Sequence, residues 1–175
     1  MDSDADNLPP IPEIDCIGVI GAGQRGTGIA EVAALADLDV RLLDVSQERL
    51  DRALERIDGH LRRRMDKGKL TDAERRAALA RIKSSLDYEG FRDCQLVVEA
   101  ATEDEAIKRD VLKTLIGYLP EDALIATNTS SISITRLAAV TDRPERFIGM
   151  HFMNPVPAMK LVELIRGIAT DEATF

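Results

Sequence analysis

The stretch Cys16-Ile-Gly-Val-Ile-Gly-Ala-Gly-Gln-Arg-Gly-Thr-Gly-Ile-Ala30 decides the fold of this chain. Its apolar run at 17–20 predicts a strand buried on both faces, and the pattern Gly21-x-Gly23-x-x-Gly26 follows at once. In such a turn the first glycine permits a tight reversal and the second lets a pyrophosphate approach the backbone. The third lets helix and strand pack closely. The predicted helix begins near Arg25 and directs its free N–H groups and positive dipole end at that pyrophosphate.

A glycine pattern alone is weak evidence, and an acidic residue after the next strand strengthens it. That strand is predicted at 38–43 and ends at Asp44, 18 positions after Gly26. At this spacing a carboxylate accepts hydrogen bonds from the adenosine ribose hydroxyls. Its charge repels a 2′-phosphate, and no arginine follows immediately, so the sequence favours NAD over NADP. The alternative is structural, because Asp44 or Ser46 also suits the N-cap of the next helix.

The composition is that of a globular protein. Of the 175 residues, 45% are hydrophobic and 31% are charged, which suits one domain with a sizeable core. The net charge of −8 and the aromatic content of 3% argue against binding of nucleic acid, which needs cations for phosphates and rings for base stacking. No apolar run reaches the length of a membrane span. We therefore expect a soluble, cytoplasmic protein without a membrane contact.

Residues 1–14 form an acidic segment with prolines at positions 9, 10 and 12. The segment has neither the basic start nor the apolar stretch of a signal peptide, and it is too acidic for a transit peptide. We predict a flexible tail over 1–14 and a single domain over 15–175.

The cysteines and histidines do not suggest a metal site. Cys16 and Cys94 fall in or beside predicted buried strands without a C-x-x-C spacing, so reduced core thiols are favoured over a disulfide or a metal. His60 and His151 are far apart and lack the spacing of metal ligands. We expect no bound metal.

Strand and helix patterns alternate along the chain. Further strands are predicted at 82–86, 95–101 and 123–127. Helices are predicted at 28–36, 47–67, 103–118 and 133–140, and another begins at 71. This order indicates an α/β fold with a Rossmann-type, doubly wound, mostly parallel sheet. Ligands bind such sheets at the carboxyl ends of the strands, where Gly21, Asp44, 99–103 and 128–130 fall. These segments should line one crevice.

Residues 62–69, with the sequence Arg-Arg-Arg-Met-Asp-Lys-Gly-Lys, form a basic cluster in an acidic chain. Such a cluster is able to hold the phosphates of an anionic substrate. A solvated helix face is the more ordinary account of any single member, and the residues alone leave both interpretations open.

The last third of the chain predicts an antiparallel strand pair at 146–152 and 160–165, joined by a proline-containing connection. If the strands pair about position 157, His151 and Glu163 lie opposite each other within reach of a hydrogen bond. A carboxylate on one imidazole nitrogen fixes the tautomer and leaves the other nitrogen free as a general base. Such a base would take the hydroxyl proton in an alcohol dehydrogenation. The alternatives are a structural pair or a lone core histidine.

With these residues in place, the sequence resembles the NAD-binding domain of the 3-hydroxyacyl-CoA dehydrogenase family, from about Ile14 to Phe175. The resemblance rests on Ile-Gly-Val-Ile-Gly-Ala-Gly-Gln at 17–24, Val-Val-Glu-Ala at 97–100 with Glu103, and two longer blocks at 128–135 and 146–163. The two longer blocks are far more specific than the glycine pattern.

The resemblance implies an NAD-dependent oxidation of a (3S)-3-hydroxyacyl-CoA to the 3-oxoacyl-CoA, in fatty acid β-oxidation or butanoate metabolism. It implies that His151 is the general base, that Glu163 is its partner, and that Ser130 lies beside the substrate oxygen and the nicotinamide. It also implies that Lys67 reaches the CoA phosphates. The implied cofactor contacts are Gly21, Ala22, Gly23, Gln24, Arg25, Gly26, Asp44, Glu103, Lys108, Ser130 and Asn154.

The chain departs from the family pattern in three respects. Arg25 stands next to the pyrophosphate where the family usually has methionine, and it either adds a phosphate contact there or clashes. A polar residue that the family often places on the CoA helix is His60 here, so that role is not carried over. The family continues into a helical domain that closes the active site and forms the dimer, and we expect that domain to be absent from these 175 residues.

Three hypotheses follow. The leading one is an NAD-dependent dehydrogenase of acyl-CoA substrates, a homodimer only where the helical domain is present. The second is an isolated NAD-binding module without turnover. The third is a relative that acts on another hydroxy acid, which predicts turnover of free acids and no dependence on Lys67.

Overall fold

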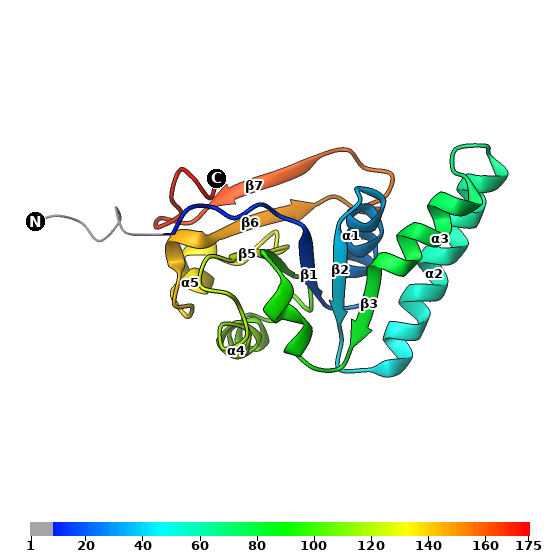
Figure 1. Ribbon diagram of the computed structural model, residues 1–175. Coiled ribbons are helices and arrows are strands. Elements are labelled where there is room, and N and C mark those ends of the chain that lie inside the picture. Colours follow the sequence, from blue (N-terminus) through cyan, green and yellow to red (C-terminus); the bar gives the residue numbers. More distant parts are fainter. Residues whose placement is uncertain (1–8) are drawn as a thin grey trace, which may run out of the picture.

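The computed structural model describes residues 9–175, which form one sheet of seven strands flanked by helices (Figure 1). The strands are β1 (Cys16–Ile20), β2 (Asp39–Leu43), β3 (Ile82–Ser85), β4 (Leu96–Glu99), β5 (Leu124–Thr127), β6 (Phe147–Phe152) and β7 (Val162–Arg166). Their order in the sheet is β3-β2-β1-β4-β5-β6-β7. Neighbouring strands are parallel except β6 and β7, which are antiparallel. The predicted Rossmann-type sheet with a C-terminal antiparallel pair is confirmed.

Helices cover both faces of the sheet. They are α1 (Gln24–Leu35), α2 (Gln47–Asp66), α3 (Asp72–Arg81), α4 (Glu105–Leu115) and α5 (Ile134–Ala138), with short 3-10 helices η2 (Glu89–Asp93) and η3 (Pro144–Arg146). α1, α2 and α3 pack against one another on one face, and α4 and α5 lie on the other (Figure 1). The α2–α3 hairpin extends outward past the edge strand β3 (Figure 1).

The central strands are buried on both faces because successive side chains point to opposite helix layers. In β1, Val19 packs toward the α1–α3 layer and Ile20 toward the α4–α5 layer. In β4, Val98 and Val97 divide in the same way. All four side chains are buried. The strand ends, and the loops that follow them, are therefore held by a packed core on both sides.

Some element boundaries differ from the sequence prediction. α1 begins at Gln24, with Gly23 as its N-cap, one residue before the start expected near Arg25 and four before the helical pattern at 28–36. α4 is shorter than 103–118 at both ends, and at its start the Asp104 side chain accepts a hydrogen bond from Ile107 N and caps the helix. The short helix η2 had no clear signal in the sequence.

The predicted tail divides into two parts. Residues 1–8 lie outside the described residues. In the second part, Ile11 and Ile14 pack against the core, and the Arg146 guanidinium donates to the Pro9 carbonyl. Gln95 Oε1 accepts from the backbone N–H groups of Asp15 and Cys16 and so fixes the start of β1. Within 9–175, no helix combines the length and the apolar character that a membrane crossing requires.

Candidate active site

The turn between β1 and α1 leaves its backbone open to a ligand. Gly21 has a φ of +105°, which favours glycine, and its N–H donates to the Leu43 carbonyl at 2.7 Å. A Cβ on Gly26 would lie 1.7 Å from the Gly21 oxygen, so α1 packs directly on the turn. A Cβ on Gly23 would meet nothing within 4 Å. The open space over Gly23, at the start of α1, is suited to a diphosphate.

Asp44 joins the end of β2 to this turn. Its Oδ2 accepts from Ala22 N at 2.9 Å, and its Oδ1 accepts from Ser46 N at 3.0 Å. Ser46, not Asp44, is the N-cap of α2, because its hydroxyl accepts from Arg49 N. The capping alternative for Asp44 therefore falls away, while its contact with a ribose remains a prediction.

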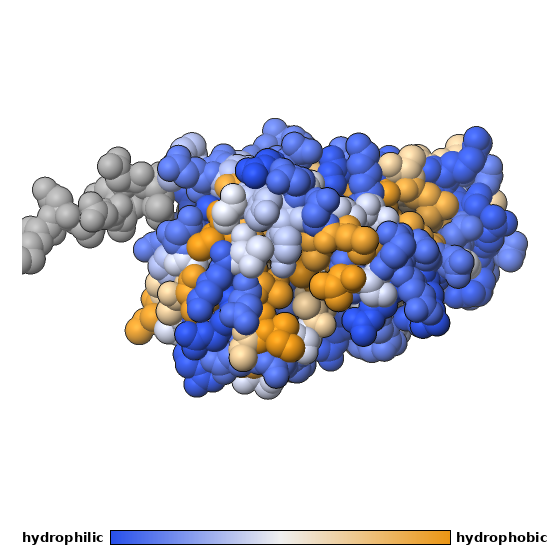
Figure 2. Space-filling model, turned by 90° about the horizontal axis from the view of Figure 1, so that it is seen from below, coloured by the Kyte–Doolittle hydropathy of each residue, from blue (hydrophilic) through white to orange (hydrophobic). Residues whose placement is uncertain are grey.

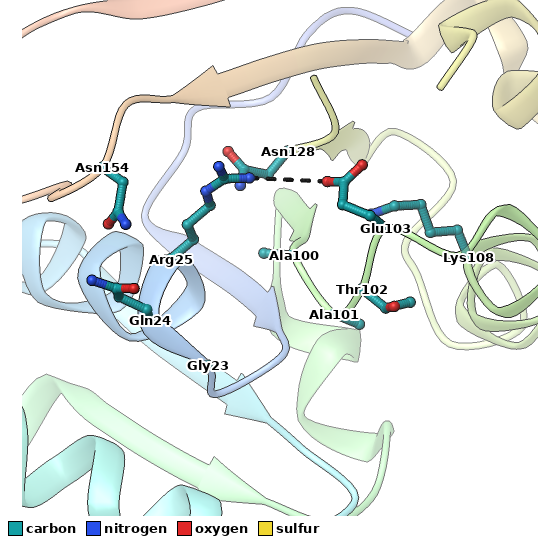
Figure 3. A pocket seen from close by; sticks show the side chains of 10 residues that line it. All are labelled: Gly23, Gln24, Arg25, Ala100, Ala101, Thr102, Glu103, Lys108, Asn128 and Asn154. Atoms are coloured by element: carbon teal, nitrogen blue, oxygen red, sulfur yellow. Dashed lines mark ion pairs between the residues drawn. The ribbon is translucent and has the colours of Figure 1, made fainter. Parts of the chain in front are cut away.

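A pocket of about 340 Å³ lies between the glycine turn and the segments after β4 and β5 (Figure 3). It brings together six of the predicted cofactor contacts from four parts of the chain: Gly23, Gln24, Arg25, Glu103, Lys108 and Asn154. Asn128, from the segment after β5, also lines it. Of the segments predicted to line one crevice, residues 100–103 and Asn128 line this pocket, whereas Asp44 and Ser130 line two other cavities.

Lys108, which lines this pocket, is held in a buried ion pair with Glu99. Lys108 Nζ lies 2.7 Å and 2.9 Å from the two carboxylate oxygens of Glu99, and the two side chains are 1% and 0% exposed. The Thr127 hydroxyl donates to Glu99 Oε1 at 2.8 Å, and Ala101 N donates to Oε2 at 2.9 Å. Lys108 thus lies at the predicted cofactor site, but its charge is committed to Glu99, a pairing that the sequence did not reveal.

A second ion pair crosses the pocket. Arg25 Nη1, on α1, lies 3.9 Å from Glu103 Oε1, in the loop before α4 (Figure 3). The other oxygen, Oε2, accepts from the hydroxyls of Thr129 at 2.9 Å and Ser131 at 3.2 Å. Glu103 is therefore anchored to the segment after β5, whereas Arg25 reaches it from the helix.

A cavity of about 640 Å³ lies beside Asp44, and α2 supplies Arg49, Arg52 and Arg56 to its lining. Arg49 Nη1 is 4.0 Å from Asp44 Oδ1. No arginine follows Asp44 immediately, but the 3.6-residue period of the helix brings these three to one side. The spacing of three and four residues between Arg49, Arg52 and Arg56 could have indicated that they share one face of the helix, but the sequence prediction did not use it.

Apolar surface accompanies these charges at the carboxyl ends of β2 and β3. Val45 and Leu86, each within two residues of a strand end, are 88% and 53% exposed. Seen from below, apolar side chains gather in the middle of the face, between polar regions (Figure 2). An exposed apolar surface next to a carboxylate is suited to a planar base attached to a ribose.

His151 and Glu163 pair across the antiparallel strands β6 and β7. They are direct register partners, as the symmetry about position 157 predicts, and His151 Nδ1 lies 2.9 Å from Glu163 Oε2. A carboxylate only accepts, so we assign the proton to Nδ1, which leaves Nε2 of the neutral ring as an acceptor. Phe152 N donates to Asn128 Oδ1 at 2.9 Å. The end of β6 is thereby tied to the lining of the pocket.

Ser130 and Lys67 lie apart from the pocket of Figure 3. Ser130 is exposed after β5 and lines a neighbouring cavity with Thr129 and Ile165. Lys67 is the exposed C-cap of α2. The 20 residues of α2, about 30 Å of helix, separate it from Ser46 beside Asp44. Lys67 therefore lies away from the cofactor pocket, and its contact with the CoA phosphates, which the resemblance implies, remains a prediction.

A buried carboxylate lies behind the glycine turn, and no sequence pattern indicated it. Glu31 of α1 is 2% exposed, and its Oε2 lies 3.1 Å from Nδ1 of His60 on α2. Burial raises the pKa of the Glu31 carboxyl, opposed by the hydrogen bond from His60 and the nearby arginines. The pair lines a cavity of about 240 Å³ with residues 154–157. A Cβ on Gly28 would lie 2.7 Å from Val156 Cβ, so this connection packs directly on α1.

The two cysteines are free thiols in the core, with their sulfurs 3.5 Å apart. The contact with Cys16 and burial raise the pKa of Cys94. Within residues 9–175, no group of three His, Cys, Asp or Glu side chains is arranged to hold a metal ion.

Residues 16–175 match the family model described as the NAD-binding domain of 3-hydroxyacyl-CoA dehydrogenase. The chain is 57% identical over 159 residues to a 3-hydroxybutyryl-CoA dehydrogenase of Bradyrhizobium diazoefficiens, covering 91% of this chain and 54% of that protein. It is 49% identical to a probable 3-hydroxybutyryl-CoA dehydrogenase of Bacillus subtilis, covering 93% of this chain and 56% of the relative.

The solved structures agree. The crystal structure of (S)-3-hydroxybutyryl-CoA dehydrogenase from Ralstonia eutropha is 48% identical and superposes with a TM-score of 0.91, over 93% of this chain and 57% of that one. The chain thus spans about half the length of the relatives that it matches.

Proposed function

Because the chain belongs to the 3-hydroxyacyl-CoA dehydrogenase family through its NAD-binding domain, we propose that it carries the cofactor site and the proton acceptor of such an enzyme. The reaction is the reversible oxidation of a (3S)-3-hydroxyacyl-CoA to the 3-oxoacyl-CoA with NAD, in fatty acid or butanoate metabolism. The names of the relatives support an acyl-CoA substrate.

The residues at the strand ends fit NAD. The open space over Gly23 and the N–H groups at the start of α1 suit a diphosphate, and Asp44 suits the adenosine ribose. The other proposed cofactor contacts are Gly21, Ala22, Gln24, Arg25, Gly26, Glu103, Lys108 and Asn154, and Ser130 lies in a neighbouring cavity. When bound, NAD supplies the hydride acceptor.

The contact between His151 and Glu163 carries the proposal. Nε2 of His151 accepts the proton of the substrate hydroxyl while the hydrogen on C3 departs with its electron pair, so the C–O bond becomes a carbonyl. Glu163, 2.9 Å from Nδ1, holds the ring in the required tautomer and stabilises the imidazolium that forms. A general base of this kind contributes about 10²- to 10⁴-fold to the rate.

The test is the appearance of NADH when the chain is mixed with NAD and (3S)-3-hydroxybutyryl-CoA. His151→Ala should lower kcat by about 10²- to 10⁴-fold and leave NAD affinity unchanged, because His151 accepts a proton from the substrate. Glu163→Gln should lower kcat less, because the amide oxygen still accepts from Nδ1. Equal turnover by wild type and His151→Ala would show that the assignment of the base is wrong.

A second candidate is an NAD-binding module whose turnover needs more chain than these 175 residues. Its support is that the chain covers 54% of the Bradyrhizobium relative. NAD binding without NADH formation would favour the module, and a homodimer would then form only in a longer protein that includes the helical domain. Turnover of free hydroxy acids, unaffected by Lys67→Ala, would instead indicate a different substrate class.

A further inference from the structure

Arg25 lies in the middle of the proposed cofactor pocket. Its side chain reaches from α1 across the pocket toward Glu103 (Figure 3), with Nη1 3.9 Å from Oε1. Arg25 is the second residue of α1, so its guanidinium is carried by the helix end whose N–H groups suit the diphosphate of NAD. One cation thus lies within reach of two anionic groups, the Glu103 carboxylate and a bound diphosphate.

The two members of the ion pair are anchored differently. Glu103 Oε2 is held by the hydroxyls of Thr129 and Ser131. Among residues 9–175, Glu103 is the one acidic residue within 4.0 Å of the Arg25 guanidinium. If the pair separates, Glu103 therefore stays in place and Arg25 is the partner that moves.

The pair is weak enough to be exchanged. Its side chains are 37% and 48% exposed, and an exposed ion pair changes an equilibrium by a factor of about five at most. A diphosphate carries two charges and several acceptor oxygens, and a guanidinium binds phosphate oxygens in a fork. The diphosphate should therefore displace the carboxylate.

We propose that Arg25 is a ligand of the NAD diphosphate and that Glu103 competes with the diphosphate for it. This inference rests on the proposed function, because it requires NAD in this pocket. When Arg25 turns to the diphosphate, Glu103 Oε1 becomes a free acceptor that faces the pocket, while Oε2 remains bound to the two hydroxyls. Arg25 thus sets both the affinity for the diphosphate and the availability of Glu103.

ADP is the sharpest probe, because it carries the diphosphate without the nicotinamide and its ribose. By calorimetry, Arg25→Met should weaken ADP binding about tenfold, the loss expected for a charge-assisted contact. Arg25→Lys should recover part of that loss. Glu103→Gln should tighten ADP binding about threefold, the reciprocal of an exposed ion pair. Adenosine, which has no phosphate, should bind wild type and Arg25→Met equally.

The double variant separates competition from simple charge repulsion. Removing the Glu103 charge favours any anion, but competition for Arg25 ends once Arg25 is gone. The gain from Glu103→Gln should therefore largely disappear in the Arg25→Met background. The matched control is Arg92→Met, which breaks an exposed Arg–Glu pair with Glu89 in η2 and should leave ADP binding unchanged.

Three outcomes would overturn the proposal: equal or tighter ADP binding by Arg25→Met, a full gain from Glu103→Gln in the double variant, or ADP binding by Glu103→Gln alone that is no tighter than that of the wild type. If the wild-type chain binds NAD and only these variant effects are missing, the proposed function stands and this inference fails. If the wild type binds neither NAD nor ADP, the proposed function fails with it. Thermal melting of each variant distinguishes lost binding from lost folding.

Discussion

Two ion pairs contribute residues to the lining of the same pocket, Lys108 from one and Arg25 and Glu103 from the other, and they differ in almost every physical respect. Glu99 and Lys108 are 2.7 Å apart and almost completely buried, whereas Arg25 and Glu103 are 3.9 Å apart and a third to a half exposed. Both carboxylates come from the same short segment, 99–103, which leaves the end of β4. Glu99 and Glu103 are four positions apart in the sequence, yet Glu99 belongs to a buried, fixed ion pair and Glu103 to an exposed pair that can exchange partners.

The difference follows from solvent. Glu99 is removed from water, so Lys108, Thr127 and the Ala101 N–H must satisfy it, and loss of any of them leaves an uncompensated group. Glu103 keeps water as an alternative partner, so its pair with Arg25 contributes little to stability. The buried pair holds Lys108 in place at the edge of the pocket. The partners of the exposed pair can exchange each other for a ligand or for water.

The largest effect should come from breaking the buried pair. Lys108→Met leaves the Glu99 carboxylate buried without its cation, which we expect to lower the free energy of unfolding by about 3–5 kcal/mol. Chemical denaturation measures the loss. The double variant Lys108→Met/Glu99→Gln removes both charges and should recover much of it. A loss below about 1 kcal/mol would mean that this pair behaves like a surface pair.

An intermediate case is Glu31–His60, in which one partner is buried and the other is 37% exposed. Burial raises the pKa of Glu31 above its ordinary value of 4.5, so the fold favours the protonated form. The stability contributed by the protonated Glu31 carboxyl is complete below the pKa that Glu31 has in the unfolded chain. It is lost as the pH rises through the higher pKa that Glu31 has in the folded protein.

Glu31→Gln should therefore raise the Tm at neutral pH, with a gain that shrinks as the pH falls and is lost below about 4.5, where wild-type Glu31 becomes protonated in both states. Thermal melts of both proteins across this range provide the measurement. The neighbouring exposed carboxylate variant Glu55→Gln serves as a control without such a trend. A Tm difference independent of pH would contradict the role given to burial.

The smallest effect should come from the exposed pair. Arg25→Met should change the free energy of unfolding by less than about 0.5 kcal/mol, because both partners are reached by water. Denaturant titrations at low and high salt should agree for the variant and the wild type. A loss of several kcal/mol would place Arg25 among the structural residues and remove the contrast with Lys108.

The sheet was predictable because its signals are local. The glycine turn, the apolar runs and the alternation of elements each depend on neighbouring residues. The register of β6 and β7 was also predictable, because the proline-containing connection fixes the centre about which His151 and Glu163 pair.

The pairings around the pocket were not predictable in the same way. Glu31 and His60 are brought together by the packing of α1 against α2, and Lys108 of α4 meets Glu99 at the end of β4. No regular spacing of residues in the sequence predicts either contact. The resemblance indicated Lys108 and Glu103 as cofactor contacts but could not indicate that one is bound by Glu99 and the other by Arg25.

The contact between Gly28 and Val156 links the two halves of the site mechanically. α1 begins at the glycine turn, and one turn later it supports the connection between β6 and β7, where only a hydrogen atom fits at position 28. A methyl group there would act as a wedge and push the connection away from the helix. The glycine at position 28 therefore sets how closely the connection between β6 and β7 approaches α1, and with it the distance between the glycine turn and the strands that carry His151 and Glu163.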